Sequence, residues 1–361
     1  MNSAESFSAG YAEARDKFRE AAREAGGALD AIANPNRAPD GGDLSTDIAW
    51  FGPRAAEKVL VMVSGTHGVE GFCGSGAQID WLRRGEAAAL PKGVAALLIH
   101  AINPYGFAWL RRVTEENVDL NRNWLDFGQP LPENAGYDEL ADAAVPSEWT
   151  AEAQRASGAV LRDFGGRHGA LALQQALSGG QYRHAKGVFY GGAGPTWARS
   201  TQEAIYARYL GQAGRIAILD YHTGLGPWGY AEPIMSDPAG SAAYRRGQDW
   251  YGCTVTTPLD GSSTSAVTAG DNLAMAPELL SHAEVTGMAL EYGTEAMNAV
   301  FLALRADAWL HGYGDPLSPE GQAIKAQIRR AFYGDADDWK GMVAGQSLAA
   351  TRKALAGLAR G

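Results

Sequence analysis

Residues 58–71 read K-V-L-V-M-V-S-G-T-H-G-V-E-G, and this stretch decides the fold class of the chain. After Lys58 it has five consecutive apolar residues, which predict a short strand that is apolar on both faces. Such strands are typical of parallel sheets that are covered by helices on both sides. A glycine-rich turn with His67 and Glu70 follows, at the carboxyl end of the strand, where open α/β sheets place their ligands.

Further apolar strands are predicted at 94–102, 216–221 and 285–292, with shorter ones at 47–51 and 252–257. Helical spacing of apolar residues is found between and after them; the predicted helices are 11–25, 74–84, 148–178, 196–212, 295–312, 318–333 and 339–358. The Pro- and Gly-rich stretch 125–147 predicts a loop or insertion. We therefore expect one α/β domain over residues 1–361, with three α/β/α layers and a mixed, mostly parallel sheet. Its core motifs span 58–294, and C-terminal helices span 295–358.

Composition excludes several classes of protein. The chain has 361 residues, with 31 Lys and Arg against 41 Asp and Glu, so its net charge of −10 disfavours nucleic-acid binding. Two cysteines allow one disulfide at most, which rules out a disulfide scaffold. The N-terminus lacks a secretory pattern, and no apolar run approaches the roughly 18 residues of a membrane span. We expect a soluble, cytoplasmic protein without membrane or nucleic-acid partners; its oligomeric state stays open.

Four polar residues at predicted strand ends indicate a metal centre. His67 and Glu70 lie three residues apart on the glycine-rich turn, and His222 follows a strand two residues after Asp220. Glu291 closes the last predicted strand. Each of these residues, taken alone, also has a purely structural explanation, such as a buried histidine or a buried ion pair. Together, two His and one Glu make a three-ligand zinc site with an open position, and the extra Glu suits metal-assisted amide hydrolysis.

The segment 102–124 carries arginines beside Asn121 and Asn123. Arg111, Arg112 and Arg122 are either ion-paired with nearby acidic residues or donors for a substrate carboxylate or a developing oxyanion. Asp220 is a candidate to orient a metal-binding imidazole, that of His222 or of His67.

These motifs resemble a known family. H-G-V-E at 67–70, N-P-Y-G-F at 103–107, D-L-N-R-N at 119–123, D-Y-H-T-G at 220–224 and the late Glu291 are similar to the zinc carboxypeptidase clan. The H-T-G context resembles its succinylglutamate desuccinylase and aspartoacylase branch. The segment G-Q-Y-R-H-A-K-G-V-F-Y-G-G at 180–192 is similar to a largely uncharacterised bacterial group within that branch.

The resemblance implies a zinc-carboxypeptidase-like fold and one Zn²⁺ per chain. It assigns zinc binding to His67, Glu70 and His222, the general base to Glu291, substrate carboxylate binding to Asn121 and Arg122, and oxyanion stabilisation to Arg112, with Arg111 as the alternative. Digestive carboxypeptidases carry a tyrosine about twenty residues before the base, and residues 262–272 have none. The Gly-, Ser- and Thr-rich stretch 260–272 is a candidate lid.

Three functions follow as hypotheses. The leading one is a zinc-dependent hydrolase that cleaves an amide bond in a small peptide or N-acyl amino acid with a free carboxylate, as a metallocarboxypeptidase does. The second is an N-acyl-amino-acid deacylase or esterase of the same fold. The third is a metal- or ligand-binding protein that does not turn over, for which Glu291 would serve no purpose.

Overall fold

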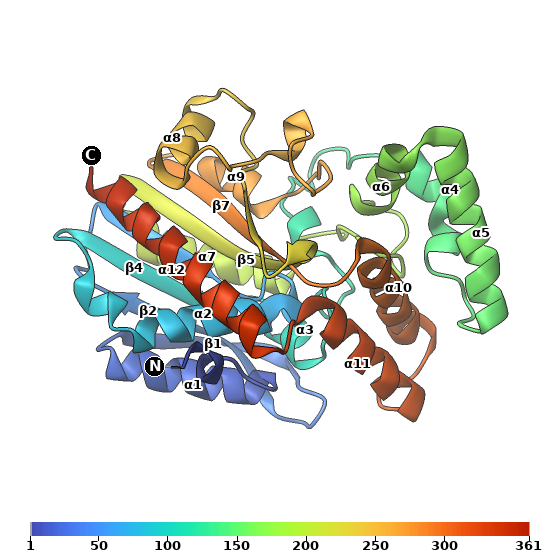
Figure 1. Cartoon of the computed structure of the whole chain (residues 1–361), viewed down its shortest axis with the longest axis horizontal. Coiled ribbons are helices and arrows are strands. Elements are labelled where there is room, and N and C mark those ends of the chain that lie inside the picture. Colours follow the sequence, from blue (N-terminus) through green and yellow to red (C-terminus); the bar gives the residue numbers. More distant parts are fainter. Residues whose placement is uncertain (1, 361) are drawn as a thin grey trace.

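A seven-stranded mixed sheet lies at the centre of the computed structural model, which describes residues 2–360 (Figure 1). Its order is β1-β2-β4-β3-β5-β7-β6. The strands are β1 (Ala28–Arg37), β2 (Asp43–Phe51), β3 (Lys58–Val63), β4 (Val94–His100), β5 (Arg215–Trp228), β6 (Ala231–Ile234) and β7 (Glu284–Gly293). The four central strands are parallel to one another, and β1, β2 and β6 join the edges in antiparallel pairings. The expected α/β class with a mixed sheet is confirmed.

Helices cover both faces of this sheet, and a further group of helices lies beside it. They are α1 (Tyr11–Glu24), α2 (Gly71–Arg83), α3 (Pro104–Ala108), α4 (Ala135–Ala144), α5 (Ala151–His168), α6 (Ala170–Ser178), α7 (Trp197–Leu210), α8 (Ala242–Tyr251), α9 (Asn272–Leu279), α10 (Met297–Tyr313), α11 (Pro319–Phe332) and α12 (Asp337–Ala359). Short 3₁₀ turns are η1 (Ser3–Ser6), η2 (Gly68–Glu70), η3 (Glu86–Ala89), η4 (Leu120–Arg122) and η5 (Pro258–Asp260). Within residues 2–360, no helix combines the length and the apolar character that crossing a bilayer requires.

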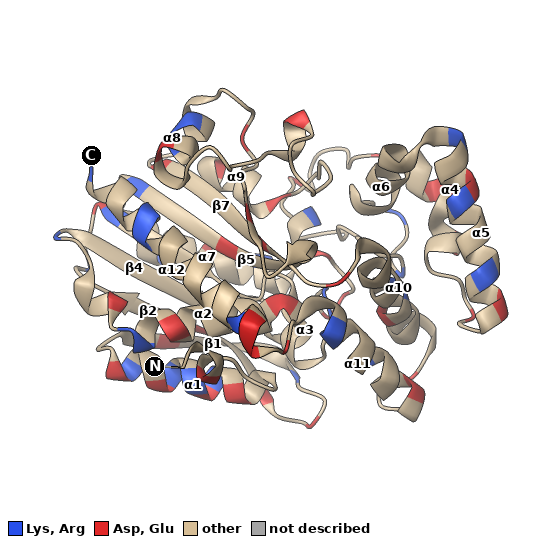
Figure 2. Cartoon of the chain, in the orientation of Figure 1, with Lys and Arg blue, Asp and Glu red and all other residues tan. Residues whose placement is uncertain are grey.

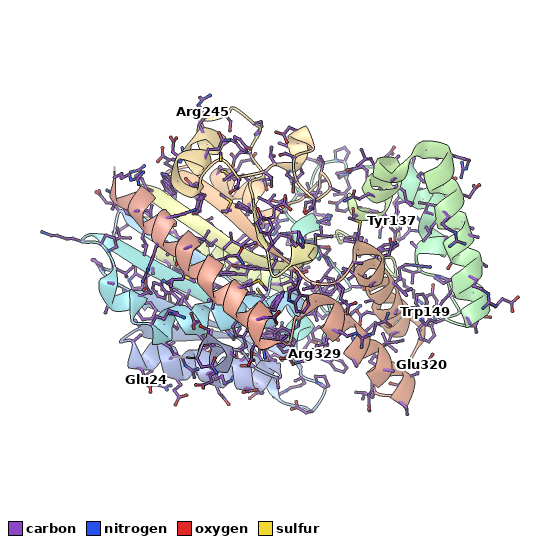
Figure 3. All side chains as sticks on the ribbon, in the orientation of Figure 1. Glu24, Tyr137, Trp149, Arg245, Glu320 and Arg329 are labelled. Atoms are coloured by element: carbon purple, nitrogen blue, oxygen red, sulfur yellow. The ribbon has the colours of Figure 1, made fainter. Side chains whose placement is uncertain are left out.

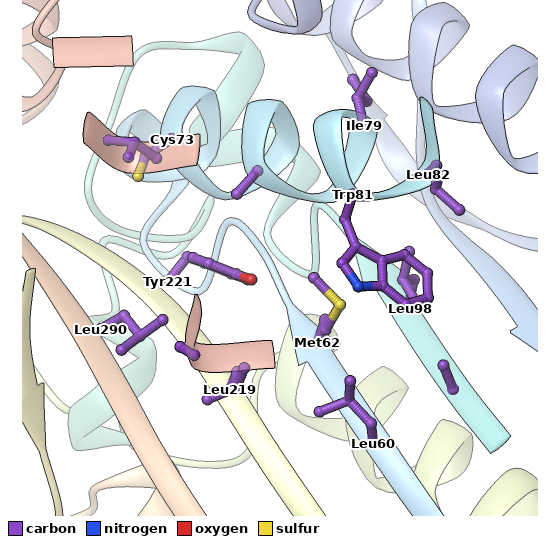
Figure 4. Packing of buried hydrophobic residues seen from close by; sticks show 14 of the residues in the cluster. Leu60, Met62, Cys73, Ile79, Trp81, Leu82, Leu98, Leu219, Tyr221 and Leu290 are labelled. Atoms are coloured by element: carbon purple, nitrogen blue, oxygen red, sulfur yellow. The ribbon is translucent and has the colours of Figure 1, made fainter. Parts of the chain in front are cut away.

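The two faces of the sheet bury separate apolar clusters, which explains the continuous apolar run of β3. Val59, Val61 and Val63 pack on one face with residues of α7 and α9. Leu60 and Met62 pack on the other face with α1, α2 and α12 (Figures 1 and 4). Side chains alternate between the faces of a strand, so a strand covered on both sides has no place for a solvated residue.

The sheet changes its direction of winding beside β3. The chain passes from β3 through α2 to β4 on one side, and later places β5 on the other side of β3. In open α/β sheets, a crevice forms at the carboxyl ends of the strands at such a switch point. Such a crevice is therefore expected beside the turn that follows β3 and the second half of β5, which holds His222. The helices α4, α5 and α6 form a separate group beside α10, on the right of Figure 1.

The sequence patterns fail in several places: the helices α3, α8 and α9 and the strand β6 are not predicted, and three further differences have a physical reason. Residues 252–257, expected as a strand, form only an isolated bridge between Thr256 and Ile234, because β6 takes the edge position beside β7. The stretch 125–147, expected as a loop, contains α4, whose first turn is capped by the side chain of Asn134. Strand β1 is not predicted at all, because it is a largely exposed edge strand with Pro35 inside it.

The structure places His100 in the core, at the end of β4. Its ring is fully buried, stacks on Phe18 with 4.5 Å between ring centroids, and has Nε2 2.9 Å from the hydroxyl of Ser75. Burial lowers the pKa of His100 from 6.5 to about 4. Between pH 4 and pH 6.5, His100 therefore binds a proton in the unfolded chain but not in the folded protein. The free energy of unfolding should therefore fall by about 3 kcal/mol from this residue as the pH is lowered from 6.5 to 4.

We expect the variant His100→Gln to lose this part of the acid sensitivity. The measurement is the free energy of urea unfolding at pH 7 and pH 4.5, in the wild type, in this variant and in His168→Gln, whose side chain is exposed. The drop between the two pH values should be smaller in His100→Gln and unchanged in the control. An equal drop in all three proteins would contradict the assignment.

Candidate metal centre

The turn after β3 carries His67 and Glu70. Its backbone packs directly on the backbone of α3, which fixes the positions of these two residues. The amide of Gly68 donates to the carbonyl of Arg112 at 3.1 Å. A Cβ on Gly68 would lie only 2.0 Å from the carbonyl carbon of Gly106, so position 68 has no room for a side chain. The two motifs that surround these glycines in the sequence thus pack directly on each other.

His67, Glu70 and His222 converge on one point. The Nδ1 of His67 lies 3.0 Å from Oε1 of Glu70, and the Nδ1 of His222 lies 3.1 Å from Oε2 of Glu70. The two Nδ1 atoms are 3.1 Å apart, and all three side chains are buried. Two imidazole nitrogens and a carboxylate in mutual contact are electron-pair donors facing one another. This donor set suits a divalent cation such as zinc.

A carboxylate lies beside the second nitrogen of each imidazole. The Nε2 of His67 lies 3.0 Å from Oδ1 of Asp119, and the Nε2 of His222 lies 3.1 Å from Oδ2 of Asp220. Asp220 is fixed in turn by the hydroxyl of Thr66, which donates to Oδ1 at 2.8 Å. Carboxylates in this position fix the ring orientation of metal-binding histidines. Asp119, the first residue of D-L-N-R-N, is thus hydrogen-bonded to His67, whereas Asp220 contacts Nε2 of His222 without the alignment of a hydrogen bond.

Glu291 lies on the strand next to His222. The two residues are register partners in the parallel pairing of β5 and β7. The backbone amide of Leu225 donates to Oε1 of Glu291 at 3.0 Å. Burial, together with the charge of Glu70, raises the pKa of Glu291 to about 7, whereas His67 and Arg112 help to hold the pKa of Glu70 well below its usual range against its own burial. The site thus contains two carboxyl groups of very different basicity.

Arg112 and Arg111 have separate environments. Arg112 donates to Oε1 of Glu70 at 2.8 Å and to Oδ2 of Asp119 at 2.9 Å. Arg111 is buried away from the centre and pairs with Asp307 on α10 at 3.1 Å. Of these two neighbouring arginines, Arg112 is thus the one that borders the cavity described below.

Asn121 and Arg122 also face the cavity. Arg122 is buried, and its Nε donates to the carbonyl of Ser178 at the end of α6 at 3.1 Å. The side-chain oxygen of Asn121 is buried and has no hydrogen-bond partner within residues 2–360. A buried oxygen without a partner costs free energy unless a ligand supplies one.

Phe189 is a residue of the site that the motifs did not single out. Its ring centroid lies 5.4 Å from the guanidinium carbon of Arg112 and 5.4 Å from that of Arg122. Its backbone has φ +54°, in the left-handed region that non-glycine residues rarely adopt. The only sequence signal was its place in the G-V-F-Y-G-G run. The ring of Phe189 therefore makes a cation–π contact with each of the two arginines.

Most of these side chains line one cavity of about 1020 Å³, whereas Glu70 and Arg111 lie outside its lining. His67, His222 and Glu291 lie in one part of its wall, and the rest is formed by α5, α6, α10 and the loop before α9. Gln175 on α6 donates to the carbonyl of Val267 in that loop at 2.8 Å. The stretch 260–272 therefore borders the cavity, and its role as a lid stays a prediction.

The chain is thus an α/β protein with a His–Glu–His cluster at the switch point of its sheet. It belongs to the family described as "Protein of unknown function (DUF2817)", whose sequence profile matches residues 7–346. No curated protein sequence matches the chain.

Solved structures with partial likeness share little sequence with the chain. A carboxypeptidase A from Helicoverpa armigera is 13% identical over 89% of this chain and 73% of its own, with a TM-score of 0.46. Bovine thrombin-activatable fibrinolysis inhibitor is 10% identical over 96% and 98%, with a TM-score of 0.42. A succinylglutamate desuccinylase from Chromobacterium violaceum is 13% identical over 84% and 74%, with a TM-score of 0.39.

Proposed function

We propose that the chain is a zinc-dependent hydrolase that cleaves an amide bond in a small peptide or an N-acyl amino acid with a free carboxylate. One observation carries the proposal: the two histidines of the His–Glu–His cluster, a carboxyl group with its pKa raised toward 7, and guanidinium donors line the same cavity. His67, Glu70 and His222 would hold one zinc ion. Bound in such a site, zinc polarises a carbonyl group and lowers the pKa of bound water to about 7.

Side chains of the protein would carry out proton transfer, stabilise the developing negative charge and bind the substrate. Glu291 accepts the proton of the attacking water and delivers it to the leaving amine, a task that suits a carboxyl group titrating near neutral pH. Arg112 stabilises the negative charge that develops on the carbonyl oxygen. Asn121 and Arg122 bind the free carboxylate of the substrate and fix its orientation.

The test is hydrolysis of a panel of dipeptides and N-acyl amino acids by the zinc-loaded protein, measured as release of free amino acid. Chelation should abolish the release, and added zinc should restore it. The comparison of peptides with acyl amino acids also separates the two kinds of substrate. A folded, zinc-loaded protein that hydrolyses no member of the panel would contradict the proposal.

Phe189→Leu should lower kcat/KM about tenfold without changing zinc content. The substitution removes the aromatic face that both guanidiniums contact, and each such contact contributes about 0.5–2 kcal/mol. The matched control is Phe127→Leu, which removes a contact with Arg199 outside the cavity. Equal kcat/KM values in the wild type and Phe189→Leu would show that the ring does not order the arginines.

A further inference from the structure

One side of the cavity is formed by a segment that contains no α-helix or strand. Residues 258–271, which we call the loop wall, begin with the short turn η5 and end at Asp271, the N-cap of α9. Leu259, Ala266 and Val267 are among its residues that line the cavity. Because no helix or sheet ladder fixes such a segment, its individual hydrogen bonds to neighbouring elements decide where it lies.

Glu232 on β6 binds the loop wall with its carboxylate. Its side chain is 5% exposed, and it is the register partner of Glu291 in the antiparallel pairing of β6 and β7. Oε1 accepts the hydroxyl of Thr256 at 2.7 Å and the amide of Thr264 at 3.2 Å, and Oε2 accepts the hydroxyl of Thr264. No Lys, Arg or His of residues 2–360 forms an ion pair with it. Since buried carboxylates are normally paired with a cation, a buried carboxylate that is bonded to a loop instead indicates a role in holding that loop.

The opposite side of the loop wall is attached to α6. Gln174 donates to the carbonyl of Thr264 at 3.1 Å, and Gln175 donates to the carbonyl of Val267 at 2.8 Å. Helix α6 contains no Lys, Arg, Asp or Glu and is tan throughout in Figure 2. It shares an apolar cluster with Tyr137 of α4, which is fully buried and is labelled in Figure 3. The loop wall thus spans from the edge of the sheet to a packed helix, and Thr264 is bonded to both.

The outer part of the cavity lining is apolar. Four large apolar side chains in this lining are each more than one-third exposed: Leu259, Val267, Met297 and Leu302. The first two belong to the loop wall and the other two to α10. Apolar side chains that gather in contact with water are typical of a binding surface. Arg122, by contrast, is 5% exposed, so a substrate whose carboxylate reaches it directs its acyl group toward the exposed apolar side chains.

We propose that Glu232 is a positioning residue that holds the loop wall in place, and that this wall binds an apolar acyl chain of the substrate. The inference rests on the proposed function and specifies its substrate class as N-acyl amino acids whose acyl group is a hydrocarbon chain of several carbons. Binding such a chain is favourable in proportion to the apolar area that is removed from water. The wall has to keep its position for this contact, because a displaced wall leaves the chain in water.

The first experiment compares N-octanoyl-alanine with N-acetyl-alanine, which differ only in the length of the acyl chain. The zinc-loaded wild type should hydrolyse the octanoyl compound with a kcat/KM at least about tenfold higher, because its additional methylene groups leave water on binding. Equal kcat/KM values, or a higher value for the acetyl compound, would overturn the proposal.

Glu232→Ala should lower the ratio of the two kcat/KM values at least about threefold at unchanged zinc content, in line with the loss of hydrogen bonds to a charged group. A residue that only stabilises the fold would affect both substrates alike, so the ratio reports the position of the wall. Glu232→Gln should keep the ratio near its wild-type value, because the amide oxygen can still accept the bonds that Oε1 accepts. Glu278→Ala, at an exposed position of α9, is the control. An unchanged ratio in a folded Glu232→Ala protein would overturn the assignment of Glu232.

Two further variants test the loop wall if Glu232→Ala does not fold. Thr264→Val removes one bond to Glu232 at an exposed position. The double variant Leu259→Ser/Val267→Ser removes apolar surface and leaves Glu232 in place. Each should lower the ratio, whereas Thr254→Val, exposed and outside the loop wall, should not. Unchanged ratios in both would overturn the proposal.

Measurements without turnover separate this inference from the proposed function. If the zinc-loaded protein hydrolyses no member of the panel, the proposed function fails, and calorimetric titration with N-octanoyl-alanine and N-acetyl-alanine still tests the wall. Tighter binding of the octanoyl compound in the wild type, with a smaller difference in Glu232→Ala, would support the inference. Hydrogen exchange of the Thr264 amide should be faster in Glu232→Ala, since Glu232 accepts its hydrogen bond. Equal affinities for the two compounds, or unchanged exchange at Thr264, would overturn the inference.

Discussion

Glu291→Gln should lower kcat by about 100- to 10,000-fold while zinc content stays at about one ion per chain. Glutamine has nearly the same shape and can still accept the amide of Leu225, which donates to Oε1 at 3.0 Å. It cannot accept a proton. Because the carboxyl of Glu291 is outside the His–Glu–His cluster, its loss leaves the three side chains of the cluster in place.

Glu284→Gln is the matched control, since Glu284 lies on the same strand at the opposite end and is solvent-exposed. Steady-state kinetics and metal analysis of both variants give the answer. In the wild type, kcat/KM should fall on the acid side as Glu291 takes up a proton, and the residual rate of Glu291→Gln should lack this decrease. Wild-type turnover in Glu291→Gln would remove Glu291 from the role of general base.

His222→Ala should lower zinc content from about one ion per chain to near zero, and with it the rate to that of chelated protein. Only His67 and Glu70 would remain, and catalytic zinc sites use three protein ligands. The measurement is elemental mass spectrometry of protein purified without chelator. His168→Ala, on an exposed helix position, is the control.

Either of two results would contradict this prediction. Full zinc content in His222→Ala would exclude His222 from the ligand set. A folded wild type that takes up no zinc would contradict the proposed hydrolase itself.

The four central strands could be predicted from the sequence because each is an apolar run of a length typical of strands. The proximity of His67, His222 and Glu291 could also be predicted, because parallel strands end at the same edge of the sheet. The edge strands of the sheet are harder to predict from the sequence. Strand β1 is mostly exposed and lacks an apolar pattern, and its pairing with β2 comes from the sheet rather than from its own residues.

The partners of the site residues could not be predicted, because they depend on contacts between distant segments. Asp119 reaches His67 across 52 positions of the chain, and its sequence neighbours suggested only an ion pair with an arginine. Phe189 contacts Arg112 and Arg122 because its backbone adopts the left-handed conformation, which no local sequence pattern predicts. Such contacts arise from the packing of loops, which periodicity does not describe.

The contact between Gly68 and Gly106 has a consequence for how the protein can evolve. Because the turn that carries His67 and Glu70 touches α3 without an intervening side chain, almost any substitution at Gly68 would displace these two residues. The helices α5 and α6 supply part of the distant wall of the cavity and none of the side chains of the His–Glu–His cluster. Selection can therefore reshape that wall for new substrates while the turn tolerates almost no change.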